Sequence, residues 1–208
     1  MSEFTGQMIR KIDACLVFAG YWLVQKGKAQ CLRVYNMSFD VGILLIRVLF
    51  GVAMAAHGAQ KIFGWFGGHG LNGTGGFFEE LGFRPGVAFA AAAGLSELGG
   101  GILLMLGLFT PFGAAAVLAA MLVALSVHLK NGFFALVNGI ELPFLYAVTA
   151  LGVALTGAGA FSLDALFGLT FLSQPYLVDG IVALAVIGAA VTVVLRRQAQ
   201  GASSATQS

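Results

Sequence analysis

The stretch VGILLIRVLFGVAMAAHGAQKI, residues 41–62, decides the fold of this chain. Its ionisable side chains are Arg47, His57 and Lys61, and almost all of the remainder is apolar or glycine. A helix needs about 20 predominantly apolar residues to cross the hydrocarbon core of a bilayer, which is about 30 Å thick. The stretch therefore predicts a transmembrane helix that carries a few ionisable groups within the membrane.

Four further apolar stretches follow at residues 87–108, 112–129, 140–156 and 177–195. Pro85, Pro111 and Pro175 lie at the breaks between them, where helices are expected to begin or end. The chain is 59% hydrophobic and 10% charged, whereas an average soluble protein has about 25% charged residues. We therefore predict an all-α transmembrane helical bundle whose partner is the lipid bilayer. Basic patches with interleaved aromatic residues are absent from the sequence, which argues against a nucleic-acid partner.

Composition divides the chain into four parts. Residues 37–165 hold the first four apolar stretches and are expected to form a four-helix core, and residues 166–197 hold a fifth span. Residues 198–208 are a polar tail that is expected to be disordered. Residues 1–36 contain no span. We interpret them as an N-terminal extension that is either not native, with Met37 as the true start, or peripheral to the membrane.

The distribution of charge predicts the orientation of the bundle. If five spans follow Met37, one side of the membrane receives Lys61, Arg84, Lys130, Arg196 and Arg197. The other side receives Asp40, Asp164 and Asp179 and no basic residue. Because cytoplasmic loops carry an excess of lysine and arginine, the basic side is predicted to face the cytoplasm.

Two charged residues lie well inside the predicted spans, and small residues share their helix faces. Arg47 is about two turns into the first span, and Glu97 is near the middle of the second. A charge at mid-membrane costs about 2.5–3.5 kcal/mol and needs a partner or a function. Their expected depths differ by about 7 Å, which an arginine can bridge. We predict that they pair, either to fix the packing of the bundle or within a working site. Gly51 and Gly101 share these faces and predict close packing of the two helices.

A second group of ionisable residues is expected at one side of the membrane. His57 and Lys61 lie near the end of the first span. His128 ends the third span, and Glu141 begins the fourth. Such groups can relay protons or hydrogen-bond the head group of a quinone or another small polar molecule. Alternatively, Lys61 and His128 extend to the interface, and Glu141 is a carboxylate at a helix N-terminus.

The connection between the first two spans, residues 63–85, is long for a tight bundle and rich in glycine and aromatic residues. Trp65 and its aromatic neighbours are predicted to lie at the level of the lipid headgroups. The same segment could cover the second group of ionisable residues, the polar cluster, as a lid.

Taken together, the candidate catalytic residues are His57, Glu97, His128 and Glu141, and the candidate ligand-binding residues are Arg47, Lys61 and Trp65. The sequence predicts no metal site.

Several short motifs resemble the DoxX family of small bacterial membrane proteins. They are Arg47, His57-Gly58-x-x-Lys61-Ile62-Phe63-Gly64, Gly75-Gly76-Phe77-Phe78, Glu97-Leu98-Gly99-Gly100, Leu106-Gly107-Leu108-x-Thr110, His128 and Gly139-x-Glu141. The resemblance covers about residues 40–165, outside which the fifth span and residues 1–36 lie. It implies a four-helix bundle of the bacterial inner membrane, often labelled an oxidoreductase and related to quinone-reducing small subunits of thiosulfate oxidation.

These observations lead to the hypothesis of a membrane component of a redox system. Its polar cluster would bind a quinone-like head group and relay protons, while electrons would come from a soluble redox partner. Two alternatives stay open. The protein could be a carrier or channel for a small solute, or a non-catalytic anchor that recruits a soluble redox enzyme through residues 63–85. The sequence also leaves open whether copies of the chain form a homo-oligomer.

Overall fold

The structure, a computed structural model, describes residues 37–205. The predictions for residues 1–36 and for 206–208 lie outside the described residues. Between residues 37 and 205 every regular element is a helix and no strand occurs, which confirms the predicted all-α fold. Residues 42–208 form one compact unit, and the packing described below is that of its described part.

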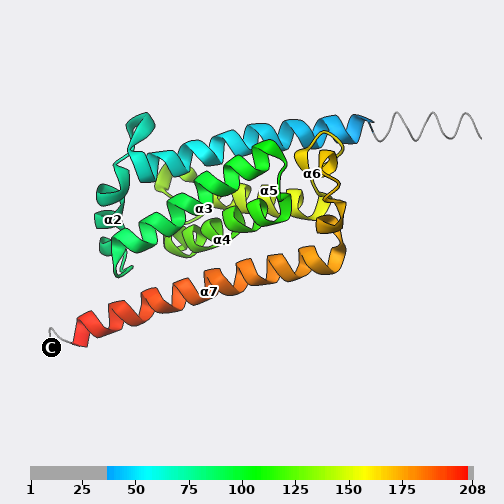
Figure 1. Cartoon of the computed structure of the whole chain (residues 1–208). Helices are drawn as coiled ribbons and strands as arrows, with labels where there is room; N and C mark the ends of the chain where they lie inside the picture. Colours follow the sequence, from blue (N-terminus) through cyan, green and yellow to red (C-terminus); the bar gives the residue numbers. More distant parts are fainter. Residues whose placement is uncertain (1–36, 206–208) are drawn as a thin grey trace, which may run out of the picture. The chain divides into compact units, whose positions relative to one another are not determined.

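Four helices among the described residues are long and apolar enough to cross a membrane (Figure 1). They are the first span Met37–Phe63, α3 (Gly86–Leu106), α4 (Thr110–His128, continued by the turn Leu129–Asn131) and α7 (Pro175–Ala205, apolar as far as Arg196). The predicted span at residues 140–156 is α5 (Glu141–Thr156), which has 16 residues. It is shorter than the others, at about 24 Å. The bundle therefore has four full-length spans and one short helix.

The remaining elements are short and connect the spans. They are η1 (Trp65–Gly67), α2 (Gly70–Glu80), η3 (Ala135–Val137), α6 (Leu163–Leu166) and η4 (Thr170–Ser173). Of these, α2 packs against α3. Residues 63–85, predicted from sequence only as a connection, therefore contain a helix of their own.

The helices begin and end where proline and glycine predict. Pro85 is extended and immediately precedes α3, and Pro111 lies in the first turn of α4, where its missing N–H has no cost. Gly107 ends α3 with a φ of 63°, a left-handed conformation that glycine adopts without strain. The predicted breaks between these spans are thus confirmed.

The first span and α3 pack with their backbones in close contact. A methyl group added to Gly51 would lie 2.6 Å from the carbonyl oxygen of Gly101, and one added to Gly58 would overlap the backbone of Leu98. On its other side, α3 approaches α4 equally closely, since a methyl at Gly100 would lie 2.7 Å from the carbonyl oxygen of Gly113. The small residues therefore allow tight helix packing, as the sequence predicted.

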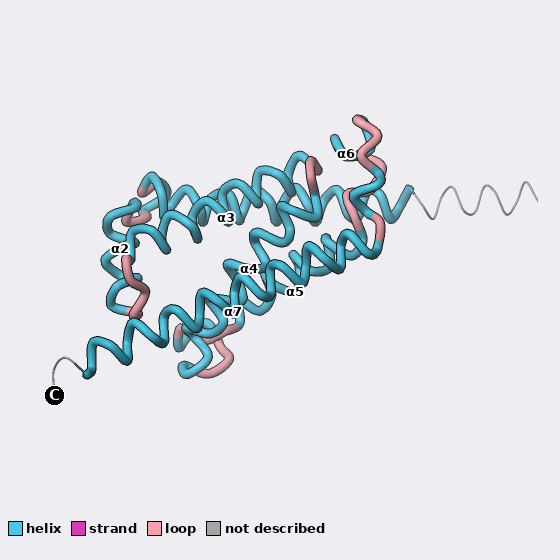
Figure 2. The backbone as a smooth tube through the Cα atoms, turned by 60° about the horizontal axis from the view of Figure 1, so that its bottom comes forward, coloured by secondary structure: helices cyan, strands magenta, loops and turns pink. Residues whose placement is uncertain are grey.

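Helix α4 is the centre of the unit, because it packs against α3, α5 and α7 (Figure 2). The core around it is apolar and includes Met54, Leu104, Val117, Ala150 and Val153, each at most 1% exposed. Helix α7 presents Leu184 and Ile187 outward, as a lipid-facing helix does.

Helix α7 also continues to Ala205, past residue 198 where a disordered tail was expected. Arginine, glutamine and alanine in residues 196–200 are good helix formers, which explains the extension.

Candidate functional site

The centre of the candidate site is an ion pair between the first span and α3. Lys61 Nζ donates to Glu97 Oε2. Glu97 lies in the middle of α3 with only 3% of its surface exposed, and the Lys61 side chain is 27% exposed. An unpaired charge at this depth would be costly, and the ion pair gives each residue an opposite charge.

The predicted pair between Arg47 and Glu97 is wrong, and the register of the helices explains why. Close packing sets Gly51 beside Gly101 and Gly58 beside Leu98. Arg47, one turn before Gly51, therefore lies against Gly107, about 15 Å further along α3 than Glu97. Lys61, one turn after Gly58, is the cation that reaches the carboxylate.

A polar cavity of about 240 Å³ lies beside the ion pair, inside the four-helix core. It is lined by Met54, His57, Lys61, Glu97, Met121, Ala124, His128, Ala135, Asn138, Gly139, Leu142, Pro143 and Tyr146. Four of the predicted site residues thus share one wall: His57, Lys61, Glu97 and His128. The His57 ring lies 5.8 Å from the Tyr146 ring, centroid to centroid.

His128 is oriented by the loop between α4 and α5. Its Nδ1 lies 2.9 Å from the carbonyl oxygen of Asn138. A carbonyl only accepts, so Nδ1 must carry the proton, and Nε2 is the nitrogen at which the neutral ring can accept another. The ammonium, the carboxylate and the two imidazoles can all exchange protons and hydrogen-bond an oxygen-bearing ligand.

An apolar cavity of about 310 Å³ lies on the other side of the ion pair. It is lined by Lys61, Phe77, Phe78, Leu81, Phe83, Phe89, Ala92, Ala93, Ser96, Glu97, Ala119, Ala120, Val123, Ala124, Val127, His128, Gly188, Ala189 and Thr192. Its walls come from α2, α3, α4 and α7. Lys61, Glu97 and His128 line both cavities.

Arg47 lies in a different environment, near the opposite end of the helices. Its Nη2 donates to the carbonyl oxygen of Phe161, and Asp164 supplies an opposite charge. The carboxylate of Asp164 accepts from the backbone N–H groups of Phe109 (2.7 Å) and Thr110 (3.0 Å). These contacts tie the segment after α5 to the turn between α3 and α4, while Arg47 Nε and Nη1 are buried without a hydrogen-bond partner.

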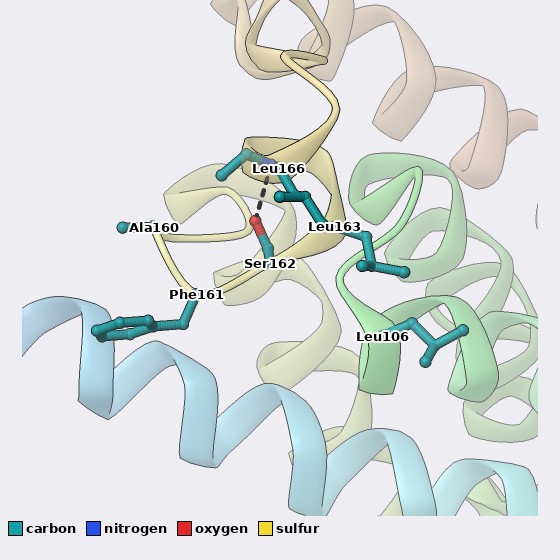
Figure 3. A pocket seen from close by; sticks show the side chains of 7 residues that line it. Leu106, Ala160, Phe161, Ser162, Leu163 and Leu166 are labelled. Carbon is teal, nitrogen blue, oxygen red and sulfur yellow. Dashed lines mark hydrogen bonds between the residues drawn. The ribbon is translucent and has the colours of Figure 1, made fainter.

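A third cavity, of about 460 Å³, lies beside this structural site (Figure 3). Its lining is apolar except for Ser162. Ser162 Oγ accepts from Ala165 N–H at 3.1 Å and donates to the Gly159 carbonyl at 2.7 Å. The one polar side chain of this lining is therefore engaged within its own segment, and the cavity offers a ligand little specific chemistry.

Two other predicted site residues lie outside the linings of both cavities at the ion pair. The Glu141 carboxylate accepts from the Ala135 N–H at 2.8 Å and so holds the loop between α4 and α5. The Trp65 side chain is 59% exposed and packs on Phe63 and Phe66. The structure thus brings together four of the seven predicted residues and separates Arg47, Glu141 and Trp65 from them.

Sequence reasoning missed Tyr146, Asn138 and Asp164 as site residues. Tyr146 is a polar ring in an otherwise apolar helix, which was a usable signal. Asn138 contributes its backbone carbonyl, so its residue type gave no signal for that contact. Asp164 was placed on the membrane side where the first span begins, and a search for the partner of Arg47 on that side would have found it.

The fold, together with the cavity that ionisable side chains line, defines a multi-pass membrane protein with a polar site inside its helical core. Residues 42–129 match the DoxX family model. Over 130 residues the chain is 34% identical to the protein named "Putative oxidoreductase CatD" of Bacillus subtilis (strain 168), covering 62% of this chain and 89% of that protein. The chain belongs to the DoxX family, as its motifs predicted.

Two shorter matches are to uncharacterized proteins of Haemophilus influenzae. One is 36% identical over 83 residues, which is 39% of this chain and 55% of the relative. The other is 42% identical over 76 residues, which is 35% of this chain and 57% of the relative. No solved structure matches the chain. The family match includes Arg47 and the four cavity residues, whereas Glu141, Asp164 and α7 lie beyond it.

Proposed function

We propose that this protein is the membrane component of a redox system and binds a quinone-like ring in the polar cavity. The observation that carries the proposal is that the Lys61–Glu97 ion pair and both His57 and His128 line one cavity within the helical core. Proton-exchanging side chains that converge on one pocket are typical of a working site. The oxidoreductase name of the Bacillus relative supports the redox class.

Each group has a role in this proposal. The Lys61 ammonium and a histidine N–H donate hydrogen bonds to the two carbonyl oxygens of the quinone. Reduction to the quinol consumes two electrons and two protons. The protons come from Lys61 and an imidazolium, and the electrons come from a soluble redox protein that docks at the membrane surface. The ion pair with Glu97 holds the Lys61 ammonium at the cavity.

The proposed location is the inner membrane of a bacterium, with the Lys61 end of the helices in the cytoplasm. Lys130 follows α4 at this end, and Arg196 of α7 donates to the Leu81 carbonyl there at 2.7 Å. The excess of basic residues at one end supports this orientation. In a variant whose Cys15 and Cys31 are replaced by serine, a cysteine introduced at Lys130 would then react with a membrane-impermeant maleimide in inverted vesicles and not in intact cells. The reverse pattern would refute it.

A binding pocket is favoured over a transport path by the packing between the two charged sites. Met54, Leu104 and Val117 fill the space between the Lys61 end and the Arg47 end, and each is fully buried. A carrier or channel would need polar groups along this route. In the described residues the apolar core separates the two charged sites instead.

The proposal is tested by titrating the tail-less ubiquinone headgroup into purified protein and measuring its Kd by calorimetry. Lys61→Met and His57→Ala should each weaken binding by about 10- to 100-fold, because a hydrogen bond from a charged group contributes about 1.5–3 kcal/mol. Asp179→Asn is the matched control, since this exposed carboxylate of α7 lines neither cavity, and should leave Kd unchanged. Equal affinity of wild type, Lys61→Met and His57→Ala would refute the proposal.

A further inference from the structure

The apolar cavity has the lining that a hydrocarbon chain requires. Phe83 is 1% exposed, and its ring lies 5.4 Å from the rings of both Phe78 and Phe89. The facing walls are alanines of α3 and α4, whose small side chains leave the space open. A volume of about 310 Å³ is at the lower end of the range of about 300–1,000 Å³ that is typical of ligand pockets.

Helix α7 closes this cavity on the side away from the core. Gly188, Ala189 and Thr192 contribute its wall. Arg196, one turn beyond Thr192, donates to the Leu81 carbonyl and lies 5.2 Å from the centre of the Phe83 ring. These two contacts anchor α7 to the turn between α2 and α3, so that the wall is held in place. The helix that the family model does not include therefore has a specific position at the cavity.

The polar and apolar cavities share four lining residues, which are Ala124 and three ionisable side chains. Lys61, Glu97 and His128 line both, and they are the ionisable residues in the lining of the apolar cavity. A molecule that fills both spaces must therefore place its polar group at the ion pair and its hydrocarbon part among the phenylalanines and alanines. A polar solute would leave the phenylalanines and alanines of the second cavity without an apolar partner, and a plain acyl chain would leave the ionisable groups of the first without a hydrogen-bond partner.

We propose that the ligand is membrane-borne, with a hydrogen-bonding ring in the polar cavity and a hydrocarbon tail in the apolar cavity, and that α7 forms the tail-binding wall. This inference rests on the proposed function, whose ring-binding site it extends. Burial of each methylene of the tail contributes about 0.8 kcal/mol. The protein therefore discriminates tailed from tail-less quinones by the contacts of α7 and α3.

The test compares the Kd of decylubiquinone with the Kd of the tail-less ubiquinone headgroup in detergent micelles of one composition. The ratio of the two constants within each variant is compared with that of wild type, so that partitioning of the tail into the micelle cancels.

Two variants fill the apolar cavity. Gly188→Leu fills it from α7, where an added methyl meets no atom within 4 Å. Ala93→Leu fills it from α3. Gly180→Leu is the matched control, because it lies on α7, is exposed, meets nothing within 4 Å and does not line the cavity.

In the two filling variants we expect the advantage of the decyl tail to fall by about tenfold, the effect of excluding about two methylenes. The Kd of the tail-less headgroup should stay within about twofold of wild type in all three variants. A tail advantage that is unchanged in both filling variants would overturn the inference, as would an equal loss in Gly180→Leu. If neither quinone binds wild type, the proposed function itself fails. If wild type binds both and shows no tail advantage to lose, only the tail-binding cavity fails.

Discussion

The two buried ionic sites of this protein differ in what their charged groups contact. At one end, the partners of Arg47 and Asp164 include the backbone of other segments: the Phe161 carbonyl, and the N–H groups of Phe109 and Thr110. At the other end, Lys61 and Glu97 pair through their side chains, and both border cavities. The first site joins segments of the chain, and its two charged side chains do not line the cavity beside it, whereas the charged side chains of the second site line two cavities.

This difference separates two explanations that a sequence cannot distinguish. A charge within a membrane span needs either a structural partner or a function. Arg47 donates to a backbone carbonyl and has Asp164 as its opposite charge, whereas Glu97 pairs with Lys61 and also lines two cavities, as the proposed function requires. The distinction predicts that substitutions at the Arg47 end change stability more than ligand affinity, and that substitutions at the Lys61 end do the reverse.

The largest stability effect is expected for Asp164→Ala. The change removes the acceptor of two backbone N–H groups and leaves Arg47 buried without its opposite charge. Breaking such a site costs about 3–5 kcal/mol in free energy of unfolding. Denaturant titration in micelles, followed by circular dichroism, measures this loss, while the quinone Kd of the folded protein should stay within about twofold.

Asp179→Ala is the control for that experiment. Asp179 is an exposed aspartate in the first turns of α7, and its replacement should cost less than about 0.5 kcal/mol. A loss below about 1 kcal/mol in Asp164→Ala, or a loss as large in Asp179→Ala, would contradict the structural role of Asp164.

A smaller effect is expected from a double-mutant cycle on the ion pair. Lys61→Met and Glu97→Gln each leave a partner without its counter-charge, and the double variant removes both charges. Residues in direct contact have coupling energies of about 0.5–3 kcal/mol. The coupling energy follows from the free energies of unfolding of wild type, the two single variants and the double variant. A coupling energy near zero would mean that the Lys61–Glu97 pair does not form.

The smallest coupling energy is expected between Arg47 and Glu97, the pair that the sequence wrongly predicted. The losses of unfolding free energy in Arg47→Met and Glu97→Gln should add within about 0.5 kcal/mol. Arg47 contacts α3 at Gly107, about 15 Å from Glu97, and the two residues are therefore too far apart to couple. The same denaturant titrations measure this cycle. A coupling above about 1 kcal/mol would restore the Arg47–Glu97 pair and remove the distinction between the two sites.

The sequence was sufficient for the long apolar helices, though not for α2, because proline, glycine and apolar length act locally. Pro85, Gly107 and Pro111 marked the helix ends, and Gly51 and Gly101 indicated where two backbones approach. The partner of Glu97 depended on register instead. A shift of a few residues between the first span and α3 decides whether Arg47 or Lys61 reaches the carboxylate, and the small residues predicted that the two faces pack without predicting which glycine lies beside which residue. The lining of the apolar cavity by α7 was equally hidden, since it joins residues that are about 100 positions apart.

Photoaffinity labelling with an azidoquinone tests the central claim most directly, because it reports where the ring binds in the intact protein. Mass spectrometry of the labelled peptides should locate the adducts among residues that line the polar cavity, near His57, Lys61 and His128. Excess unlabelled quinone should abolish them. Adducts confined to residues 160–166, at the Arg47 end of the helices, or spread over the lipid-facing surface would contradict the account.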